Sequence, residues 1–329
     1  MIAAARTDEI VASIVIEWEN IQLAEADRCS AMLAELTRQI AAYPGQHAAG
    51  ARDFEILVIF DDHKISAAGV REFVASCVSA FPDRADVRFI PGSGRGYYEQ
   101  KNLGVAEARG RVVVFLDSDV IPEPGWLPGL LGSFADPAVE VVCGNCYLDT
   151  GDLVSKSLAL AWFFPLRDGR EVLARQDSFF ANNVAFRREV AVRYPFVPLE
   201  GTSRGACRLL ARRLTEDGRG LFVNTAARVS HPAPNGLRHL LLRGLAQGRD
   251  NLLFDRTIGR GAAGASLTRA VRMQTRAWKR IVRHRRTVAL GVLGVPAALA
   301  IASMYYACYA VGDAATRVAP GWAGRHLRV

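Results

Sequence analysis

The chain has 329 residues, of which 50% are hydrophobic and 22% charged, and its formal net charge is +8. This length is enough for one large α/β domain with an appendage. The charge is unevenly distributed, because residues 204–286 contain 19 basic and 4 acidic residues, whereas residues 1–203 contain 19 and 28. A basic third beside an acidic body indicates an anionic partner, either a lipid surface or phosphate groups. Nucleic acid is excluded as the expected partner, since no recognition helix, zinc finger or stacking sheet accompanies the arginines.

The six cysteines lack the spacing of a disulfide framework, which indicates a reducing compartment. Cys143 and Cys146 form a single CxxC sequence, which is typical of a redox pair or of half a zinc site. No second CxxC or spaced histidine pair completes a tetrahedron, so neither interpretation is favoured. The amino terminus lacks the charged start and long apolar run of a secretory signal.

Apolar strands alternate with amphipathic helices through the first part of the chain. Strands are predicted at residues 13–16, 54–60, 87–90 and 112–116, and further strands at 139–142 and 220–224. Helices are predicted after Asn20, where Leu23, Met32, Leu33, Leu36 and Ile40 would point inward, and at residues 70–79 and 98–108. A glycine-rich loop at 92–96 precedes the last of these helices. The alternation predicts an α/β fold with a parallel sheet.

Two aspartates separated by one serine follow the apolar strand at residues 112–116, and Pro122 and Pro124 end regular structure beyond them. Asp117, Ser118 and Asp119 therefore lie at the carboxyl end of a strand, where open α/β sheets bind ligands. Carboxylate oxygens at that edge suit Mg²⁺ or Mn²⁺ holding a diphosphate. A solvated turn is the alternative when the tripeptide is considered alone.

The carboxyl-terminal region contains a run without charged residues from Val288 to Val311. A helix of this length is about 36 Å long, enough to cross a bilayer. Several arginines precede the run, and by the positive-inside rule they place the preceding domain in the cytoplasm and the tail outside. A buried core helix or a re-entrant hairpin is the alternative. The basic segment at 236–286 is predicted to form amphipathic helices on a membrane surface, with a solvated basic face as the alternative.

Five segments occur in an informative order: SIVIEWEN at 13–20, FEILVIFDDHKIS at 54–66, GRGYYEQKNLGVAEARGRVVVFLDSDVIPEPGWL at 94–127, FFANNVAFRREV at 179–190 and VSHP at 229–232. Together they resemble the family 2 glycosyltransferases, which have a GT-A fold, over roughly residues 12–250. The resemblance implies a Rossmann-like, nucleotide-diphospho-sugar transferase domain at 1–235. Basic amphipathic juxtamembrane helices would follow at 236–286, a transmembrane helix at 287–312 and a short tail at 313–329.

The resemblance implies a donor site and a metal site. The implied donor-binding residues are Glu17, Asn20, Asp61, Asp62, Lys101, Asn102, Asp117, Ser118 and Asp119. Asp61 or Asp62 would contact the nucleotide base, with Lys101 and Asn102 in the same pocket. Asp119 is the preferred direct ligand of Mg²⁺ or Mn²⁺, Asp117 lies closer to the ribose, and His231 is a further ligand or phosphate contact. Taken singly, the same residues are also typical of turns, solvated charges and core histidines.

The acceptor half departs from the family pattern. Family members commonly carry a Gly-Glu-Asp whose carboxylate is the general base, where this chain has Gly-Ala-Cys at 205–207. Glu200 is the preferred substitute base, and Asp177 is a more distant candidate. Asn182 and Asn183 fall in the acceptor-side segment. A phosphate acceptor would need no base, because it is already anionic.

These features predict a metal-dependent, inverting glycosyltransferase at the cytoplasmic membrane, with its catalytic domain facing the cytoplasm. It would move a sugar from a nucleotide-sugar donor to a lipid-linked or envelope-glycan acceptor. The alternative is a catalytically degenerate scaffold that binds nucleotide sugar during envelope glycan assembly. Nucleotidyl transfer is disfavoured, since the amino terminus has no glycine-rich activation loop.

Overall fold

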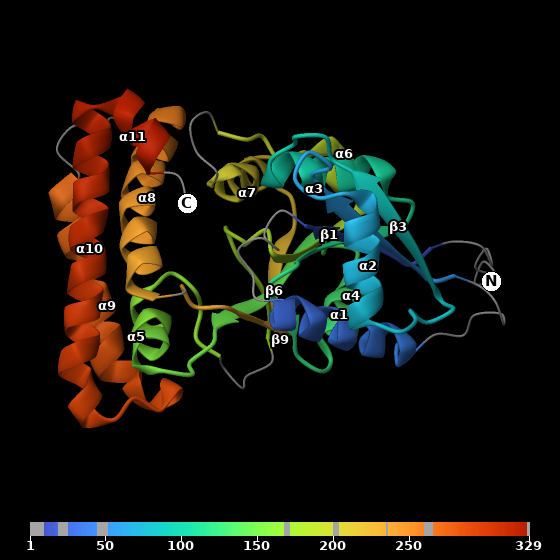
Figure 1. Ribbon diagram of the computed structural model, residues 1–329, viewed down its shortest axis with the longest axis horizontal. Coiled ribbons are helices and arrows are strands. Elements are labelled where there is room, and N and C mark those ends of the chain that lie inside the picture. The colour runs from blue at the N-terminus through green and yellow to red at the C-terminus, as the bar shows by residue number, and fades with distance from the viewer. Residues whose placement is uncertain are drawn as a thin grey trace. The chain divides into compact units, whose positions relative to one another are not determined.

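The computed structural model describes residues 10–18, 26–44, 52–167, 172–199, 204–234, 236–259 and 266–327. The chain forms two compact units (Figure 1). Unit 1 comprises Met1–Cys146, Asp168–Val197 and Ala206–Ser230, and unit 2 comprises Tyr147–Arg167, Pro198–Gly205 and His231–Val329.

Four parallel strands form one half of the sheet. They are β1 (Ala12–Glu17), β2 (Phe54–Phe60), β3 (Ala85–Pro91) and β4 (Val112–Asp117), in the order β3-β2-β1-β4. Every residue of β1, β2 and β4 is buried, as expected for central parallel strands covered on both faces. The predicted strands of this half are confirmed to within a few residues.

The other half of the sheet is antiparallel. It contains β5 (Ile121–Pro122), β6 (Val141–Leu148), β7 (Leu173–Arg175), β8 (Asn183–Arg187) and β9 (Leu221–His231). The order continues as β4-β8-β6-β9-β5, with β7 beside β9, and β4–β8, β6–β8, β5–β9 and β7–β9 are antiparallel pairs. The parallel sheet predicted from the alternation is therefore confirmed for β1 to β4, and the strands that follow pair in antiparallel fashion. The regular alternation of strand and helix ends there, so the crossover rule that favours parallel pairing no longer applies.

The helices of unit 1 are α1 (Ala26–Ala41), α2 (Ala67–Cys77), α3 (Tyr97–Glu107), α4 (Trp126–Gly132), α6 (Arg188–Arg193) and α7 (Ala206–Glu216), with a 3₁₀ turn at Ser133–Ala135. The inward positions predicted for α1 are confirmed at Met32, Leu33, Leu36 and Ile40. Leu23 lies outside the described residues. Helix α2 begins after Ser66, whose hydroxyl accepts a hydrogen bond from the Gly69 N–H.

Helix α3 packs directly on β1 through a glycine. A Cβ atom at Gly104 would lie 2.3 Å from Cγ1 of Val15, so any larger residue would push the helix off the strand. This close approach fixes the height of α3 above the sheet. It also fixes the position of Lys101, one turn earlier on the same helix.

A buried carboxylate ties β2 to its neighbours on the sheet. Glu55 is fully buried, accepts a hydrogen bond from Ser13 Oγ at 2.6 Å and is bonded by the Arg109 backbone N–H and guanidinium. Desolvation raises the pKa of Glu55, but the hydrogen bonds from Ser13 and Arg109 outweigh it and leave the pKa below its usual value. Glu55 therefore stabilises the fold as an anion.

We expect Glu55→Gln to lower the free energy of unfolding by roughly 1–3 kcal/mol, because the buried donors lose a charged partner. Since the folded-state pKa is depressed, the contribution is present above the unfolded value of about 4.3 and is lost as the pH falls. Urea unfolding between neutral and acid pH measures both effects. Glu72→Gln, at an exposed position on α2, is the matched control. An equal loss at both positions would contradict the assignment.

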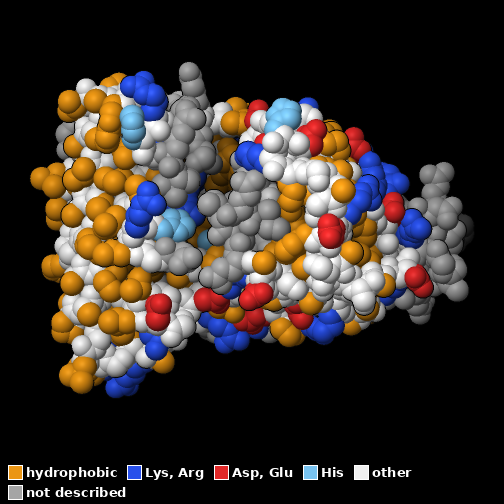
Figure 2. Space-filling model, viewed as in Figure 1, with side chains coloured by type: hydrophobic (Ala, Val, Ile, Leu, Met, Phe, Trp, Pro, Cys, Tyr) orange, Lys and Arg blue, Asp and Glu red, His pale blue; other side chains and the backbone are white. Residues whose placement is uncertain are grey.

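Unit 2 is mainly helical, with α5 (Leu153–Ala161), α8 (Gly236–Thr257), α9 (Ser266–His284), α10 (Val295–Val318) and α11 (Pro320–His326), and 3₁₀ turns at Arg285–Val288 and Val292–Gly294. Helix α10 packs against α5, α8 and α9. Hydrophobic side chains gather over the helices of this unit (Figure 2).

One helix among the described residues, Val292–Val318, is long and apolar enough to cross a membrane. Its position differs from the predicted apolar run. The first residues of that run form 3₁₀ turns, and α10 begins at Val295 with Pro296 in its first turn, where proline is well tolerated. The helix then continues beyond the run to include Asp313 and Arg317, which form a salt bridge.

Candidate functional site

The carboxyl ends of three parallel strands bring acidic residues to one edge of the sheet. Glu17 ends β1 and lies opposite Asp117, which ends β4, while Asp61 follows β2. Glu17 is fully buried, and Asp117 and Asp61 are 5% and 6% exposed. Burying carboxylates is costly unless cations or hydrogen bonds compensate them, so the partners of each residue decide what it can do.

Asp117 is compensated by two residues of α3. Lys101 is fully buried, and its Nζ lies 2.6 Å from Oδ1 of Asp117. The Tyr97 hydroxyl donates to the same carboxylate, at 3.0 Å from Oδ1 and 2.8 Å from Oδ2. The Lys101 ammonium also lies 4.5 Å from the centre of the Tyr97 ring. The structure therefore brings the predicted residues Lys101 and Asp117 into direct contact, and Tyr97 is a third member of the same cluster.

Tyr97 is a site residue that the sequence interpretation missed. Burial raises the pKa of Tyr97 well above its usual value, and the nearby charges of Asp117 and Glu17 raise it further, so the hydroxyl stays protonated and donates. Tyr97 precedes Lys101 by four residues. On a helix that spacing places both side chains on one face, and this pattern could have identified Tyr97 once α3 was predicted.

Arg28 holds the turn that contains Asp119. Its Nε donates to the Asp119 carbonyl at 2.6 Å, and its Nη2 donates to the Ser230 carbonyl at 2.7 Å and to Ser230 Oγ at 3.0 Å. The guanidinium thus links α1, the turn after β4 and the end of β9. Sequence reasoning did not find Arg28, because its partners are 91 and 202 residues away.

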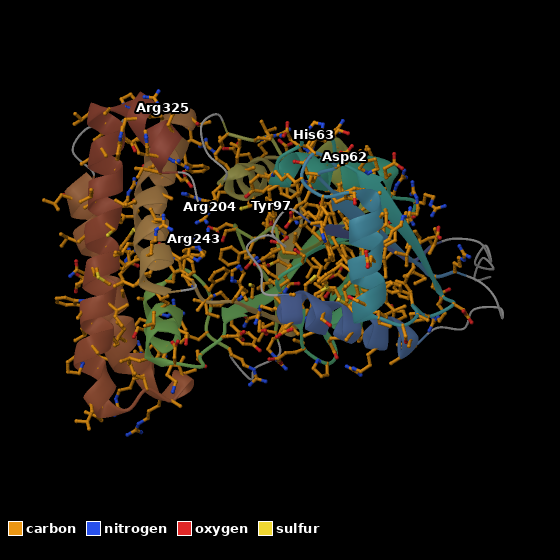
Figure 3. All side chains as sticks on the ribbon, viewed as in Figure 1. Asp62, His63, Tyr97, Arg204, Arg243 and Arg325 are labelled. Carbon is orange, nitrogen blue, oxygen red and sulfur yellow. The ribbon has the colours of Figure 1, made fainter. Side chains whose placement is uncertain are left out.

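Asp61 and Asp62 fix the glycine-rich loop. Oδ1 of Asp61 accepts the Gly94 N–H at 2.8 Å, and Oδ1 of Asp62 accepts the Ser93 N–H at 2.6 Å. Figure 3 labels Asp62 and the adjacent His63. Ser93 and Gly94 have φ values of 45° and 75°, and the two hydrogen bonds stabilise this left-handed turn.

Both aspartates are also favoured as anions. Desolvation raises the pKa of Asp61, but backbone hydrogen bonds from Gly94 and His63 and the Lys64 charge outweigh it and lower the pKa. The Ser93 hydrogen bond lowers the pKa of Asp62. The loop therefore presents negative charge at the end of β2.

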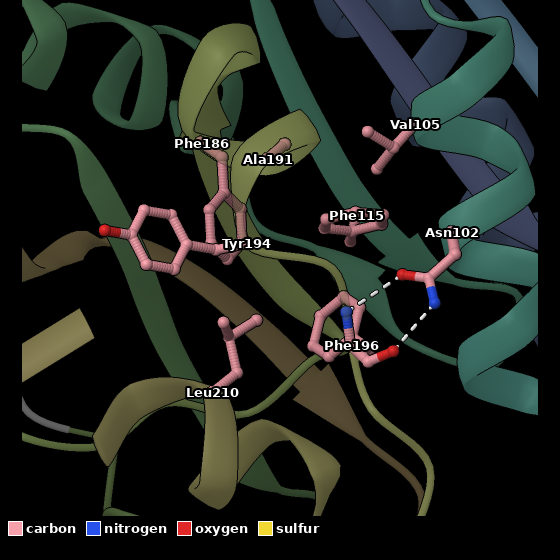
Figure 4. A pocket seen from close by; sticks show the side chains of 8 residues that line it. All are labelled: Asn102, Val105, Phe115, Phe186, Ala191, Tyr194, Phe196 and Leu210. Atoms are coloured by element: carbon pink, nitrogen blue, oxygen red, sulfur yellow. Dashed lines mark hydrogen bonds between the residues drawn. The ribbon is translucent and has the colours of Figure 1, made fainter. Parts of the chain in front are cut away.

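Both polar groups of the Asn102 amide are bonded to the Phe196 backbone (Figure 4). Its Nδ2 donates to the Phe196 carbonyl at 2.8 Å, and its Oδ1 accepts the Phe196 N–H at 2.9 Å. Phe115, Tyr194 and Leu210 line the same pocket, which has no room for a water molecule. This geometry gives Asn102 a structural task in joining α3 to the segment after α6.

The two asparagines before and within β8 have different surroundings. Asn183 accepts from Trp126 Nε1 at 2.8 Å and donates to the Ala227 carbonyl at 3.2 Å, so its amide joins strands. The Asn182 carbonyl accepts the Asp117 N–H at 3.3 Å, which places Asn182 beside the end of β4. Oδ1 of Asn182 and Oγ of Ser118 are buried without a hydrogen-bond partner in the described part of the chain. Such groups are expected to bond a ligand or water.

His231, Asp177, Asn20 and Glu200 complete the set of predicted site residues. His231 belongs to unit 2, where its ring lies 4.9 Å from that of Phe164 and its Nδ1 lies 2.7 Å from the Pro232 carbonyl. Asp177 is exposed after β7 in unit 1. Asn20 and Glu200 lie outside the described residues.

The CxxC pair does not form a zinc or redox site. Cys143 and Cys146 are three residues apart on β6, so their side chains point to opposite faces of the strand. Burial raises the pKa of Cys143 to about 12 and that of Cys146 well above its usual value, which disfavours the thiolates that metals require. Cys143 accepts a hydrogen bond from Gln176 Nε2 at 2.6 Å.

The described residues contain no group of three or more His, Cys, Asp or Glu side chains that could hold a metal by themselves. Mg²⁺ and Mn²⁺ do not need such a cage, because one or two carboxylates and the phosphates of a substrate complete their coordination. Asp117 is bonded to Lys101 and Tyr97, and Asp119 follows it two residues later at this edge of the sheet.

The sequence matches the profile described as "Glycosyl transferase family 2" over residues 27–194, about half of the chain. The chain belongs to glycosyl transferase family 2. Pre-mycofactocin glycosyltransferase of Mycobacterium tuberculosis is 39% identical over 87 residues, in a match that covers 23% of this chain and 18% of that protein. The chain thus spans less than a fifth of this relative.

Two solved structures share the fold of this family member. A mannosyltransferase from Pyrobaculum calidifontis, in complex with GDP-Man and Mn²⁺, superposes with a TM-score of 0.59 at 17% sequence identity. The match covers 96% of this chain and 89% of the mannosyltransferase chain. TarS 1–349 of S. aureus, in complex with UDP-GlcNAc, has a TM-score of 0.50 at 12% sequence identity. This match covers 94% of this chain and 92% of the TarS chain. The prediction of a GT-A fold and of membership in glycosyltransferase family 2 is confirmed.

We expect Lys101→Met to lower the free energy of unfolding by about 3–5 kcal/mol, because Asp117 would stay buried without its cation. The double variant Lys101→Met/Asp117→Leu should recover much of this loss, since no lone charge remains. Urea unfolding of the single and double variants measures the coupling. Lys279→Met, at an exposed lysine, should change stability by less than about 0.5 kcal/mol. If the free-energy changes of Lys101→Met and Asp117→Leu were additive, the two side chains would not be energetically coupled, which would contradict the ion pair.

Proposed function

We propose that this glycosyltransferase transfers a sugar from a nucleotide-diphosphate donor, with a divalent cation bound through Asp119, at the sheet edge formed by β1, β2 and β4. The observation that carries the proposal is the pairing of Asp117 with Lys101 and Tyr97. It compensates the charge of Asp117, and Asp119 follows two residues later on the same turn. The donor complexes of the two structural relatives, with GDP-Man and UDP-GlcNAc, support this donor class.

Each residue at the edge has a proposed task. Asp117, fixed by Lys101, contacts the ribose, while Asp61 and Asp62 hold the loop beside the base. Ser118 offers its hydroxyl to the donor, and Glu17 lies beneath the ribose site next to Asp117. Asn102 serves indirectly by fixing α3. His231 is proposed as a further phosphate or metal contact.

A bound Mg²⁺ or Mn²⁺ would neutralise the diphosphate and stabilise the charge of the leaving nucleotide. Arg28 keeps the Asp119 turn in place through its bond to the Asp119 carbonyl. Asp117 need not move when the donor binds, because its buried partners already compensate its charge. Electrostatic preorganisation of this kind lowers the barrier without reorganisation during the reaction.

We expect Asp119→Asn to reduce metal-dependent donor turnover by about 100-fold or more, because the neutral amide is a poor ligand for a hard cation. Calorimetric titration of GDP and UDP with and without Mn²⁺ should show that the variant has lost the metal-dependent part of binding. Asp83→Asn, an exposed aspartate of unit 1, is the control and should behave as the parent protein. Full activity of the Asp119 variant would remove the metal assignment.

The acceptor half of the proposal rests on Glu200. Glu200 is proposed as the base that removes the proton of an acceptor hydroxyl in an inverting transfer, with Asp177 as the second candidate and Asn182 as an acceptor contact. Asn183 supports Asn182 from within β8. An acceptor phosphate would need no base and would suit the basic charge of residues 204–286.

We expect Glu200→Gln to lower kcat by about 10²–10⁴ with a hydroxyl acceptor while leaving donor binding unchanged. Asp177→Asn, tested in parallel, should have a small effect because its carboxylate is exposed beyond β7. The readout is steady-state transfer together with donor affinity. Unchanged kcat in both variants would reject both bases and favour an anionic acceptor.

The loss of the Gly-Glu-Asp sequence at 205–207 favours a second candidate, a scaffold that binds nucleotide sugar without transferring it. Metal-dependent donor hydrolysis by the purified protein separates the two candidates, since a scaffold binds the donor but leaves it intact.

We further propose that the protein works at the cytoplasmic face of a membrane on a lipid-linked or envelope-glycan acceptor. The proposed division places the catalytic domain at 1–235 and the basic amphipathic segment at 236–286, followed by the apolar helix of the segment 287–312 and the tail at 313–329. The basic composition of the second segment and the apolar length of α10 support membrane association.

A further inference from the structure

The outward face of α10 is apolar along its whole length. From residue 291 to residue 318 every exposed position is an apolar residue or glycine, including Leu293, Ala300, Ala307, Val311 and Val318. Leu293 is 96% exposed and Val318 is 86% exposed. Contiguous apolar surface on this scale marks an interaction site rather than ordinary solvent exposure.

Helix α9 extends this surface. Leu267, Val271, Trp278 and Val282 are 69%, 53%, 41% and 59% exposed, and their spacings of four, seven and four residues place them on one side of the helix. Trp278 Nε1 donates to Ser303 Oγ of α10 at 3.2 Å. The stripe on α9 therefore lies next to α10, and the two faces form one apolar surface.

Cations border the stripe. Helix α9 contains six arginine and lysine residues and no acidic residue. Four of them, Arg272, Arg276, Lys279 and Arg283, are exposed at helical spacing on the side next to the stripe. Arginine and lysine beside tryptophan and branched aliphatic side chains are typical of helices that lie in the interface of an anionic bilayer.

The packing of α8 on α10 argues against α10 crossing a membrane. A Cβ atom at Gly244 would lie 2.8 Å from the Tyr305 carbonyl oxygen, one at Gly248 would lie 2.0 Å from the Tyr309 oxygen, and one at Gly312 would lie 2.0 Å from the Leu245 oxygen. The two backbones are therefore in contact over at least two turns. Wherever α10 lies, α8 lies beside it.

Helix α8 is not fit for the hydrocarbon core. It contains Arg243, the buried pair Arg249 and Asp250, and Asp255 and Arg256 near its end. A charged residue at the centre of a bilayer costs about 2.5–3.5 kcal/mol on insertion scales. A crossing α10 would carry several such charges into the membrane, whereas an α10 lying in the interface would not.

We infer that α9 and α10 lie in the plane of an anionic membrane surface, with the apolar surface of Leu267, Val271, Trp278, Val282 and the outward face of α10 facing the lipid. The inner face of α10 stays packed on α8. The inference does not depend on the proposed transferase activity, since it concerns only the lipid contact of unit 2.

Vesicle binding tests the lipid contact. The full chain should sediment with vesicles of phosphatidylglycerol and phosphatidylcholine in equal parts much more than with phosphatidylcholine alone. We expect Val271→Glu/Val282→Glu to reduce binding by at least about tenfold, because anions would replace two exposed valines that are proposed to contact the lipid. Val192→Glu/Val197→Glu alters two valines of unit 1 that are 56% and 44% exposed, and this control should bind as the parent protein does.

Two outcomes of this experiment would overturn the inference. One is an equal loss of binding in both double variants. The other is a concentration-dependent dimer without vesicle binding that dissociates in Val271→Glu/Val282→Glu, which would assign the surface to a second copy of the chain. Circular dichroism and donor binding show whether each variant is folded, and they also separate a failure of lipid contact from a failure of the proposed function.

Reporter fusions at the carboxyl terminus distinguish an α10 that lies in the membrane surface from an α10 that crosses the membrane. With α10 in the interface, the carboxyl terminus stays on the same side as the catalytic unit, so a carboxyl-terminal fluorescent protein is bright in bacterial cells and an alkaline phosphatase fusion is inactive. A crossing helix gives the reverse pair of results, which would overturn the inference.

Discussion

The buried ion pair between Lys101 and Asp117 is the interaction on which the donor edge depends. Two charges leave water to form it, and this is favourable only with close geometry and additional hydrogen bonds. The Tyr97 hydroxyl supplies these bonds, and the contact of Gly104 with Val15 sets the height of α3 that brings Lys101 to the end of β4. The pair thus couples the packing of a helix to the position of a carboxylate.

The rest of the donor edge consists of similar ties between distant segments. Arg28 joins the Asp119 turn to Ser230, and Asp61 and Asp62 hold the loop that precedes α3. Acidic residues therefore enter from the parallel half of the sheet. Asn182, whose carbonyl is bonded to the Asp117 N–H, enters from the antiparallel half. The change of strand direction at β4 brings the two kinds of residue together.

In unit 2, the packing of the helices depends on glycines and on an amphipathic sequence pattern rather than on buried ion pairs. Gly244, Gly248 and Gly312 allow the backbones of α8 and α10 to touch, which leaves the opposite face of α10 uncovered. The apolar stripe and cationic side of α9 continue that face. Hydropathy alone cannot distinguish a helix that crosses a bilayer from one that lies on it, because the distinction depends on the helix packed behind it.

The sequence by itself determined the parallel strands, the helices between them, the family and the aspartates at the end of β4, because apolar periodicity and motif order are local properties. It did not determine the antiparallel half, whose strands pair across 41 to 109 residues without a local pattern, as in the Cys143–Val184 and Ile121–Ser230 pairs. Only the tertiary structure decided that Asp117 is compensated by Lys101 and Tyr97, that Arg28 holds Asp119, and that Asn102 bonds the Phe196 backbone. Those roles follow from contacts between side chains that are distant in the sequence and become buried together in the fold. The local sequence pattern does not specify such contacts.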